Sequence, residues 1–198
     1  MTSNEWNDYA DDWDCNKNVH IYAQRTFELW EKKVAPLYSN LSECKVLDFG
    51  CGTGLLTEKL AARCGQIVAI DTSQKMIDVL RSKIARLGID NVVASNVAIN
   101  AESTRENSEL LNNFDLIVAS SVCSFLPDYV TTLCDLSLVM RPGACFVQWD
   151  WMEDMPQERI RVAFDAAGLI NHDIDQAFSM KENGELMPVV MGMGRMQS

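Results

Sequence analysis

The chain has 198 residues, of which 47% are hydrophobic, and its formal net charge at pH 7 is −11. A chain of this length suits one domain, because it buries roughly 70% of the surface that its unfolded form exposes. The negative charge repels phosphate backbones, so we expect no nucleic-acid partner. No stretch reaches the ~18 consecutive apolar residues of a membrane span, and the acidic, polar start does not resemble a signal peptide. We therefore expect a cytoplasmic protein without a membrane partner.

Residues 1–43 precede the first predicted strand and form an arm that is too short to be a domain. The arm divides into an aromatic and acidic segment over residues 6–14 and a helical pattern over residues 22–34. Its aromatic residues bury large areas wherever they pack. They could cover a ligand or an apolar edge of a sheet, and both interpretations stay open.

The most informative segment follows the arm: VLDFGCGTG at residues 46–54 combines an apolar strand, an acid and three alternating glycines. Apolar residues on both faces are typical of a strand buried in a parallel sheet. Glycines allow the backbone to turn sharply and to lie against a ligand. We therefore expect a nucleotide-like ligand at this turn, followed by a helix from Leu55 to Cys64.

A second carboxylate, Asp71, ends the next predicted strand, which covers residues 66–70. Open α/β sheets bind ligands at the carboxyl edge of their strands, and a carboxylate there can accept hydrogen bonds from the hydroxyls of a ribose. A dinucleotide fingerprint would need a third glycine where this chain has Leu55. The spacing therefore disfavours a nicotinamide-dependent oxidoreductase.

The rest of the chain alternates helices and strands up to a terminal hairpin. In order we predict a helix over 73–88, strands over 91–99 and 114–120, a loop at 121–127, a helix over 128–140, a strand over 144–148, a loop at 149–151, a helix over 160–167 and a hairpin of 174–180 with 186–193. Apolar residues that alternate from Met187 to Met193 predict one buried strand face. Arg81, Lys83 and Arg86 could form a basic patch, but their helical spacing favours a solvent-exposed face.

Four motifs in this order resemble those of class I S-adenosylmethionine-dependent methyltransferases of the small-molecule type, similar to UbiE and type 11 domains. They are DFGCGTG at 48–54, DTSQKM at 71–76, FDLIV at 114–118 and MRPGA at 140–144. The resemblance implies an α/β fold: a Rossmann-like, seven-stranded, mostly parallel sheet with helices on both faces and a C-terminal antiparallel hairpin. It also implies a single methyltransferase domain over 1–198, with an N-terminal arm or lid at 1–43 and the core at 44–198.

The resemblance also implies a cofactor, S-adenosyl-L-methionine, whose product is S-adenosyl-L-homocysteine. The residues that it implies for cofactor binding are Trp13, Asp48, Gly50, Cys51, Gly52, Gly54, Asp71, Thr72, Met76, Asn100, Ala101 and Ser120. The residues that we expect near the substrate are Tyr9, Ser124, Trp149 and Trp151. Asn100 stands where the family usually has an aspartate beside the adenine, and its amide oxygen can still accept a hydrogen bond from the adenine amino group.

The sequence identifies no catalytic residue, because methyl transfer mainly requires that the acceptor be held in line with the S–CH₃ bond, and a base is optional. His20 and Asp150 are the candidates for a base, with surface packing and helix capping as the alternatives. A Mg²⁺ site of the catechol type needs carboxylates after both the fourth and the fifth strand, and only Asp150 is in place, so we expect no metal. The seven cysteines lack CxxC spacing, which favours buried free thiols.

These patterns lead to one functional hypothesis: a methyltransferase that transfers a methyl group from S-adenosylmethionine to a small-molecule substrate by in-line displacement at the sulfonium. The Asn/Asp-Pro-Pro-Tyr/Phe signature of nucleobase and glutamine-amide methyltransferases is replaced by SSVC at residues 120–123. The connection at 151–158 is short, so the arm alone would roof the pocket. An open mouth also suits a protein or peptide terminus. That activity and a non-catalytic S-adenosylmethionine-binding module are the alternatives, and the sequence makes no prediction of the oligomeric state.

Overall fold

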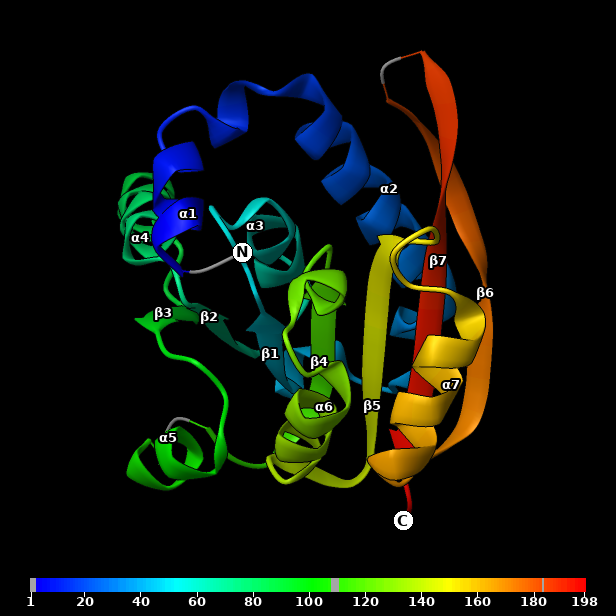
Figure 1. Cartoon of the computed structure of the whole chain (residues 1–198). Coiled ribbons are helices and arrows are strands. Elements are labelled where there is room, and N and C mark those ends of the chain that lie inside the picture. The colour runs from blue at the N-terminus through cyan, green and yellow to red at the C-terminus, as the bar shows by residue number, and fades with distance from the viewer. Residues whose placement is uncertain (1–2, 108–110, 183) are drawn as a thin grey trace. The chain divides into compact units, whose positions relative to one another are not determined.

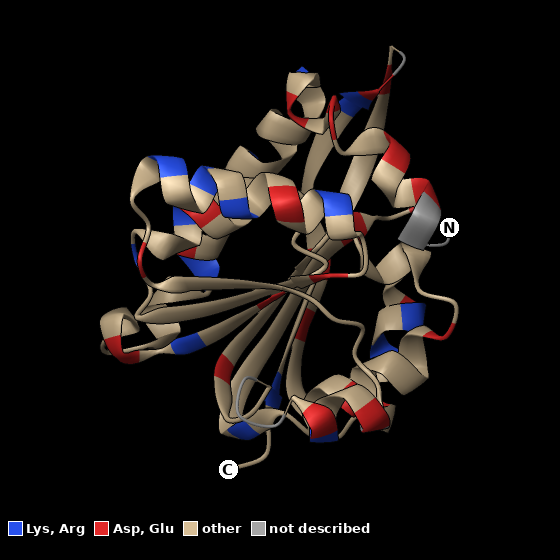
Figure 2. Ribbon diagram, turned by 90° about the vertical axis from the view of Figure 1, so that its left-hand side faces the viewer, with Lys and Arg blue, Asp and Glu red and all other residues tan. Residues whose placement is uncertain are grey.

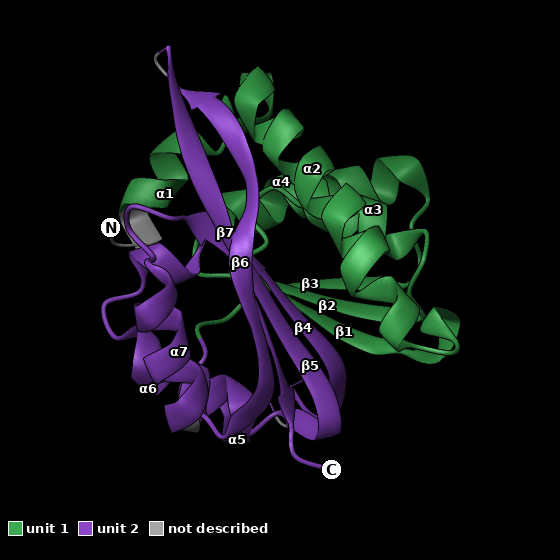
Figure 3. Cartoon of the chain, turned by 90° about the vertical axis from the view of Figure 1, so that its right-hand side faces the viewer, with its two compact units in different colours: residues 1–98 green, residues 99–198 purple. Residues whose placement is uncertain are grey.

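A computed structural model describes residues 3–107, 111–182 and 184–198. The chain divides into two compact units, residues 1–98 and 99–198 (Figure 3). Seven strands form the sheet, and each unit contains both strands and helices (Figure 1). The first unit contributes strands in the order β3-β2-β1 and the second contributes them in the order β4-β5-β7-β6.

The first unit is built on three parallel strands: β1 (Lys45–Phe49), β2 (Gln66–Asp71) and β3 (Val92–Asn96). In β1 every residue after Lys45 is buried, and in β2 the side chains from Ile67 to Ile70 are buried. Both faces of these strands are therefore covered, as the continuous apolar runs predict. The register pairs Phe49 with Ile70, which brings the carboxyl ends of β1 and β2 to one edge.

Four α-helices belong to this unit: α1 (Ser3–Tyr9), α2 (Lys17–Lys33), α3 (Leu55–Ala61) and α4 (Gln74–Leu87). Short 3-10 helices lie between α1 and α2, at η1 (Trp13–Cys15), and between α2 and β1, at η2 (Ala35–Leu37) and η3 (Leu41–Glu43). The α4 helix begins after Ser73, whose side chain caps the Met76 N–H, and it ends at Gly88 in the left-handed region. Helix α1 packs against α4, and α2 packs against α3 (Figure 1).

The second unit contains β4 (Phe114–Ser120), β5 (Met140–Trp151), β6 (Leu169–Glu182) and β7 (Glu185–Met196). Its helices are α5 (Ala101–Glu106), η4 (Cys123–Phe125), α6 (Tyr129–Ser137) and α7 (Gln157–Ala166). Strands β4 and β5 are parallel, whereas β7 runs antiparallel to both β5 and β6. The Phe164 ring of α7 packs edge-on against Phe146 of β5, with 5.7 Å between ring centroids. A Cβ at Gly192 would lie 2.8 Å from Ile160 Cγ2, so this glycine lets α7 approach β7 closely.

The predicted Rossmann-like fold is confirmed, and the largest differences lie in the length of the last three strands. Strand β5 continues through Trp151, so the loop predicted at residues 149–151 is wrong. The β6 strand begins at Leu169, well before the predicted residue 174. In the alternating set of β7, Val189 and Met191 are buried. The division into one domain with an arm at 1–43 stays a prediction.

The prediction that the cysteines are buried is confirmed for some of them. Cys44, Cys64, Cys123 and Cys145 are buried, whereas Cys51 and Cys134 are half-buried and Cys15 is exposed. Within the described parts of the chain, none of the helices is long and apolar enough to span a membrane.

Candidate functional site

The loop between β1 and α3 is held to the end of β2 by its own backbone. The N–H groups of Gly50 and Cys51 both donate to the carbonyl oxygen of Ile70, at 2.9 and 3.0 Å. Gly50, Gly52 and Gly54 have φ values of 69°, 53° and 86°, in the left-handed region that glycine adopts without strain. The alternating glycines of the sequence therefore produce this turn.

Two of these glycines serve different purposes. A Cβ at Gly54 would lie 2.3 Å from Leu80 Cδ1, so Gly54 is required for close packing between the start of α3 and α4. A Cβ at Gly52 would meet nothing within 4 Å, so the backbone there borders open space. The open side of the loop is at Gly52, which is where a ligand could lie against the backbone.

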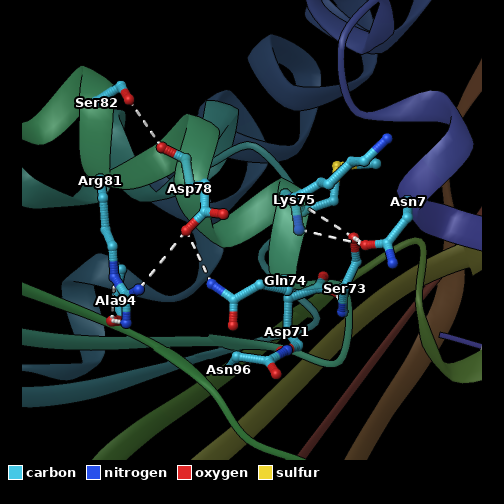
Figure 4. A network of polar contacts seen from close by, with 11 residues as sticks. Asn7, Asp71, Ser73, Gln74, Lys75, Asp78, Arg81, Ser82, Ala94 and Asn96 are labelled. Carbon is cyan, nitrogen blue, oxygen red and sulfur yellow. Dashed lines mark hydrogen bonds and ion pairs between the residues drawn. The ribbon is translucent and has the colours of Figure 1, made fainter. Parts of the chain in front are cut away.

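Asp71 ends β2, where it lies near Ser73 and Asn96 (Figure 4), and it is bound by the same loop. Its Oδ2 accepts a hydrogen bond from the Gly52 N–H at 2.9 Å, and its Oδ1 accepts one from the Ser73 N–H at 2.8 Å. Asn96 of β3 donates to the Asp71 carbonyl oxygen at 2.8 Å, which fixes the backbone as well. The Thr72 N–H also contributes a hydrogen bond to this carboxylate. An ionised carboxyl offers about four lone-pair sites, so acceptor capacity remains for a ligand. Burial raises the pKa of Asp71, and hydroxyl donors from a ligand would offset that penalty.

Asp48 lies beneath the loop and contacts the protein instead of the open side. It is 1% exposed, and its Oδ2 accepts a hydrogen bond from Thr57 Oγ1 of α3 at 2.6 Å. Burial raises the pKa of Asp48 to about 7, and the nearby charge of Asp71 adds to the shift. Cys51 lies in the loop itself, where burial raises the pKa of its thiol. Asp48 therefore links β1 to α3 through a buried hydrogen bond beneath the glycine loop.

The N-terminal arm is attached to both sides of the loop. Asn7 Oδ1 accepts hydrogen bonds from Ser73 Oγ at 2.7 Å and from the Lys75 N–H at 3.2 Å, directly after Asp71 (Figure 4). Asp14 Oδ1 accepts a hydrogen bond from Thr53 Oγ1 at 2.6 Å, within the glycine loop. The arm therefore contacts both the glycine loop and the segment that follows Asp71.

Aromatic residues of the arm pack on one another. The Trp6 ring lies 6.0 Å from Tyr9 and 6.0 Å from Trp13 between centroids, and Tyr9 is 49% exposed. His20 of α2 is exposed and donates from Nε2 to the Asp14 carbonyl oxygen at 2.8 Å. His20 therefore stabilises the local turn of the arm, in keeping with the alternative to a base.

Other residues implied for the cofactor occupy the start of α4 and the second unit. Thr72 is exposed, whereas Met76 is 2% exposed and packs in the core. Asn100 is the N-cap of α5, where its side-chain oxygen accepts hydrogen bonds from the backbone N–H groups of Glu102 and Ser103 at 3.0 and 2.9 Å. Ala101 is the first residue of α5, and Ser120 is the half-buried last residue of β4. Capping explains an amide at position 100, because asparagine is among the preferred N-cap residues.

The residues predicted after the fifth strand lie inside that strand. Trp149 and Asp150 are both 0% exposed, because β5 pairs with β4 on one side and β7 on the other and is covered on both faces. Only Trp151, at the end of the strand, is half-buried. The buried Trp149 indole thus has no surface to offer a substrate, which corrects the idea of two tryptophans in a loop.

Asp150 is the centre of a buried polar network within the second unit. Its Oδ1 accepts a hydrogen bond from the Ser124 N–H at 3.0 Å, and its Oδ2 accepts one from Gln148 Nε2 at 2.9 Å. Gln148 Oε1 accepts a hydrogen bond from the Tyr129 hydroxyl. Burial raises the pKa of Asp150 to about 7. The network fixes the loop that carries Ser124, so Asp150 positions that loop and is not an exposed base.

The cations of α4 do not form a basic patch. Arg81 donates to the Ala94 carbonyl oxygen from Nε and Nη2, at 3.2 and 3.0 Å (Figure 4). Lys83 is 9% exposed. The prediction of a solvent-exposed face is therefore wrong for Lys83. Figure 2 shows basic and acidic residues interspersed along the helices. Among the residues that the structure describes, no group of three or more His, Cys, Asp or Glu could hold a metal ion.

Comparison with known families decides the identity of the fold. The family described as "Methyltransferase domain" matches residues 47–146, which is half of the 198 residues. The chain belongs to the methyltransferase domain family. The resemblance to class I S-adenosylmethionine-dependent methyltransferases is thereby confirmed, with S-adenosylmethionine as the cofactor.

Curated relatives match part of this methyltransferase domain. An uncharacterized methyltransferase of Schizosaccharomyces pombe is 33% identical over 109 residues, which are 54% of this chain and 38% of the relative. The ubiquinone biosynthesis O-methyltransferase of Aromatoleum aromaticum is 30% identical over 107 residues, 53% of this chain and 43% of the relative. The demethylmenaquinone methyltransferase of Lactococcus lactis is 25% identical over 136 residues, 66% of this chain and 51% of the relative. The chain spans about half the length of these relatives or less.

Solved methyltransferase structures share the fold. The N-methyltransferase NodS of Bradyrhizobium japonicum, in complex with S-adenosylhomocysteine, has a TM-score of 0.71 over 99% of this chain and 97% of that chain, at 18% identity. A SAM-dependent methyltransferase from Aquifex aeolicus has a TM-score of 0.62 over 82% of this chain and 88% of that chain, at 21% identity. At these identities the likeness establishes the fold alone.

The first unit of this methyltransferase fits the cofactor. The open backbone at Gly52 suits the methionine part, because no side chain of the loop fills that space. Asp71 suits a ribose hydroxyl, because its carboxylate keeps acceptor capacity beyond its backbone hydrogen bonds. Thr53, Ser73 and Lys83 support this arrangement, and the sequence did not predict these roles for them. Each is bound by an arm residue that lies far away in the chain, which local sequence patterns do not reveal.

Proposed function

We propose that this protein transfers a methyl group from S-adenosylmethionine to a small-molecule acceptor. The observation that carries the proposal is the Asp71 carboxylate, which the N–H groups of Gly52 and Ser73 orient beside the open side of the glycine loop. The names of two relatives contain the names of small quinone compounds, ubiquinone and demethylmenaquinone, and this supports a small acceptor. The net charge of −11 disfavours a nucleic acid.

The bound cofactor supplies an electrophilic methyl group on its sulfonium. The residues of this chain would bind and orient it: the glycine loop would hold one end, and Asp71 would accept hydrogen bonds from the sugar. The arm, tied at Asn7 and Asp14, would limit the access of water. Orientation of this kind can lower a barrier by roughly 7–11 kcal/mol. A dedicated base is therefore not required, which agrees with the structural roles of His20 and Asp150.

Calorimetry with S-adenosylhomocysteine tests the cofactor site. Asp71→Ala should weaken binding by about 1.5–3 kcal/mol, the value of hydrogen bonds to a charged group. Asp90→Ala is the matched control, because Asp90 is an exposed carboxylate of the same unit. Asp71→Asn serves as a second variant that keeps one acceptor oxygen. Equal affinities for the wild type and both Asp71 variants would contradict the ribose contact, and with it the observation on which the proposal rests.

Labelled S-adenosylmethionine distinguishes the classes of acceptor. The protein is incubated with the cofactor and with a cell extract divided by filtration into metabolite and protein fractions. Label that passes into the metabolite fraction supports a small-molecule acceptor, and label in the protein fraction supports a protein or peptide terminus. Tight cofactor binding without labelled product in either fraction would support a non-catalytic binding module.

A further inference from the structure

One carboxylate of the arm joins the glycine loop to helix α4. Asp14 lies in η1, and its Oδ1 accepts a hydrogen bond from Thr53 Oγ1 at 2.6 Å. Its Oδ2 forms an ion pair with Lys83 Nζ at 2.6 Å, and the same ammonium lies 3.1 Å from Glu58 Oε1 of α3. Asp14 thus contacts the cofactor loop and the helix behind it with separate oxygens.

The burial of these groups makes the contact stronger than a surface ion pair. The side chains of Lys83, Glu58 and Asp14 are 11%, 29% and 31% exposed, and Thr53 is 1% exposed. Exposed ion pairs contribute little because water screens them, whereas a partly buried pair is screened much less. Loss of Asp14 would leave Lys83 with one carboxylate and the Thr53 hydroxyl without its acceptor.

The backbone that presents Asp14 is also fixed. The His20 Nε2 donates to the Asp14 carbonyl oxygen at 2.8 Å, and Asn16 caps the start of α2 by accepting a hydrogen bond from the Asn18 N–H at 2.9 Å. A turn with these two supports directs the Asp14 carboxylate toward Thr53 with little freedom. The arm therefore reaches the glycine loop through a preorganised contact.

We propose that Asp14 is a positioning residue for the cofactor, which orients the glycine loop through Thr53. This inference rests on the proposed function, since it concerns the affinity for S-adenosylmethionine. Thr53 lies between Gly52 and Gly54, so a hydrogen bond to its side chain constrains the backbone beside the space at Gly52. The contact of the arm with the loop and the cofactor affinity are then coupled, and such coupling is reciprocal: bound cofactor must also stabilise that contact.

A double-mutant cycle measured by calorimetry with S-adenosylhomocysteine tests this coupling. Asp14→Ala and Thr53→Val should each weaken binding about tenfold, and the double variant should bind no more weakly than the weaker-binding single variant. Thr53→Ser keeps the hydroxyl and should restore binding to near the wild-type value. Asp12→Ala is the control, because it removes the same side chain from an exposed position two residues away.

Limited proteolysis gives a second measurement that a merely structural role would not change. S-adenosylhomocysteine should slow cleavage within residues 1–43 several-fold in the wild type and in Asp12→Ala, but not in Asp14→Ala. If Asp14→Ala proves too unstable to purify, Thr53→Val tests the same hydrogen bond while it leaves the ion pair with Lys83 intact.

The outcomes separate this inference from the proposed function. Additive effects in the cycle, or an affinity of Asp14→Ala equal to that of Asp12→Ala, would overturn the positioning role while the Asp71 result stands. A wild-type protein that fails to bind S-adenosylhomocysteine would overturn both proposals.

Discussion

Gly52 and Gly54 belong to one motif, yet the physical reason for glycine differs between them. An added methyl group at Gly54 meets Leu80 Cδ1 at 2.3 Å, and the φ of 86° adds backbone strain. We expect Gly54→Ala to lower the free energy of unfolding by about 2–4 kcal/mol, the sum of overpacking and left-handed strain. Urea denaturation measures this loss.

Gly52→Ala should lower the stability of the fold less than Gly54→Ala does, and it should mainly weaken cofactor binding. A methyl group there meets no protein atom, so only the strain of a φ of 53° applies, and the expected loss of stability is about 1–2 kcal/mol. The same methyl group would occupy the space that we assign to the cofactor. Calorimetry with S-adenosylhomocysteine should therefore show a larger loss of affinity than the loss of stability alone suggests. A Gly52→Ala protein that binds as tightly as the wild type would contradict that assignment.

Buried Asp150 predicts a specific pH dependence of stability. Burial raises the pKa of Asp150 to about 7, so the folded state holds this proton more tightly than the unfolded state, where the pKa is about 4. The stabilisation is complete below about pH 4 and is lost as the pH rises to about 7. Within that window the free energy of unfolding should fall by up to about 1.4 kcal/mol per pH unit for this group.

Asp150→Asn isolates this contribution, because the amide does not titrate. The free energy of unfolding, measured by urea denaturation at several pH values from 4 to 8, should decline less steeply with pH in the variant than in the wild type. Asp154→Asn, an exposed carboxylate of the same unit, should keep the wild-type slope. Parallel curves for the wild type and Asp150→Asn would show that Asp150 ionises normally in the fold.

At the scale of elements, Ser73 joins a helix cap to the arm. Its Oγ accepts a hydrogen bond from the Met76 N–H at 3.2 Å and donates one to Asn7 Oδ1 at 2.7 Å. Ser73→Ala should cost about 1 kcal/mol for the lost cap of α4, in addition to the arm contact. Asn7→Ala loses the arm contact alone, so its thermal unfolding midpoint should fall less. An equal decrease in both variants would mean that the cap adds nothing.

The sequence predicts the elements better than it predicts the contacts between them. Apolar runs and glycine positions predict β1, β2 and α4 closely, because local backbone rules fix them. The extension of β5 through Trp151 depends on its pairing with β7, which local patterns do not contain. Lys83 follows a helical spacing that favours exposure, and only its partners Asp14 and Glu58 explain why it is buried. Polar residues supplied by distant segments are therefore the part of the site that a single sequence does not predict.

At the scale of the whole molecule, the residues assigned to the cofactor loop, the ribose carboxylate and the arm all belong to the first unit, residues 1–98. Ligand binding should therefore protect this unit first. Hydrogen exchange with S-adenosylhomocysteine should slow most over residues 46–57 and in the arm, and least in the hairpin of β6 and β7. Equal protection in both regions would argue against a ligand held by the glycine loop.

Thermal unfolding tests the choice of cofactor for the intact chain. A ligand that binds only the folded state stabilises it by about 2.7 kcal/mol at a concentration of 100 times its Kd. For a chain of this size, each kcal/mol raises the midpoint by about 2–4 °C, so S-adenosylhomocysteine should raise it by about 5–11 °C. NAD should give no shift, because Leu55 stands where a dinucleotide loop needs its third glycine. A shift with NAD and none with S-adenosylhomocysteine would assign the glycine loop to a dinucleotide, and the Asp71→Ala protein should then lose that shift instead.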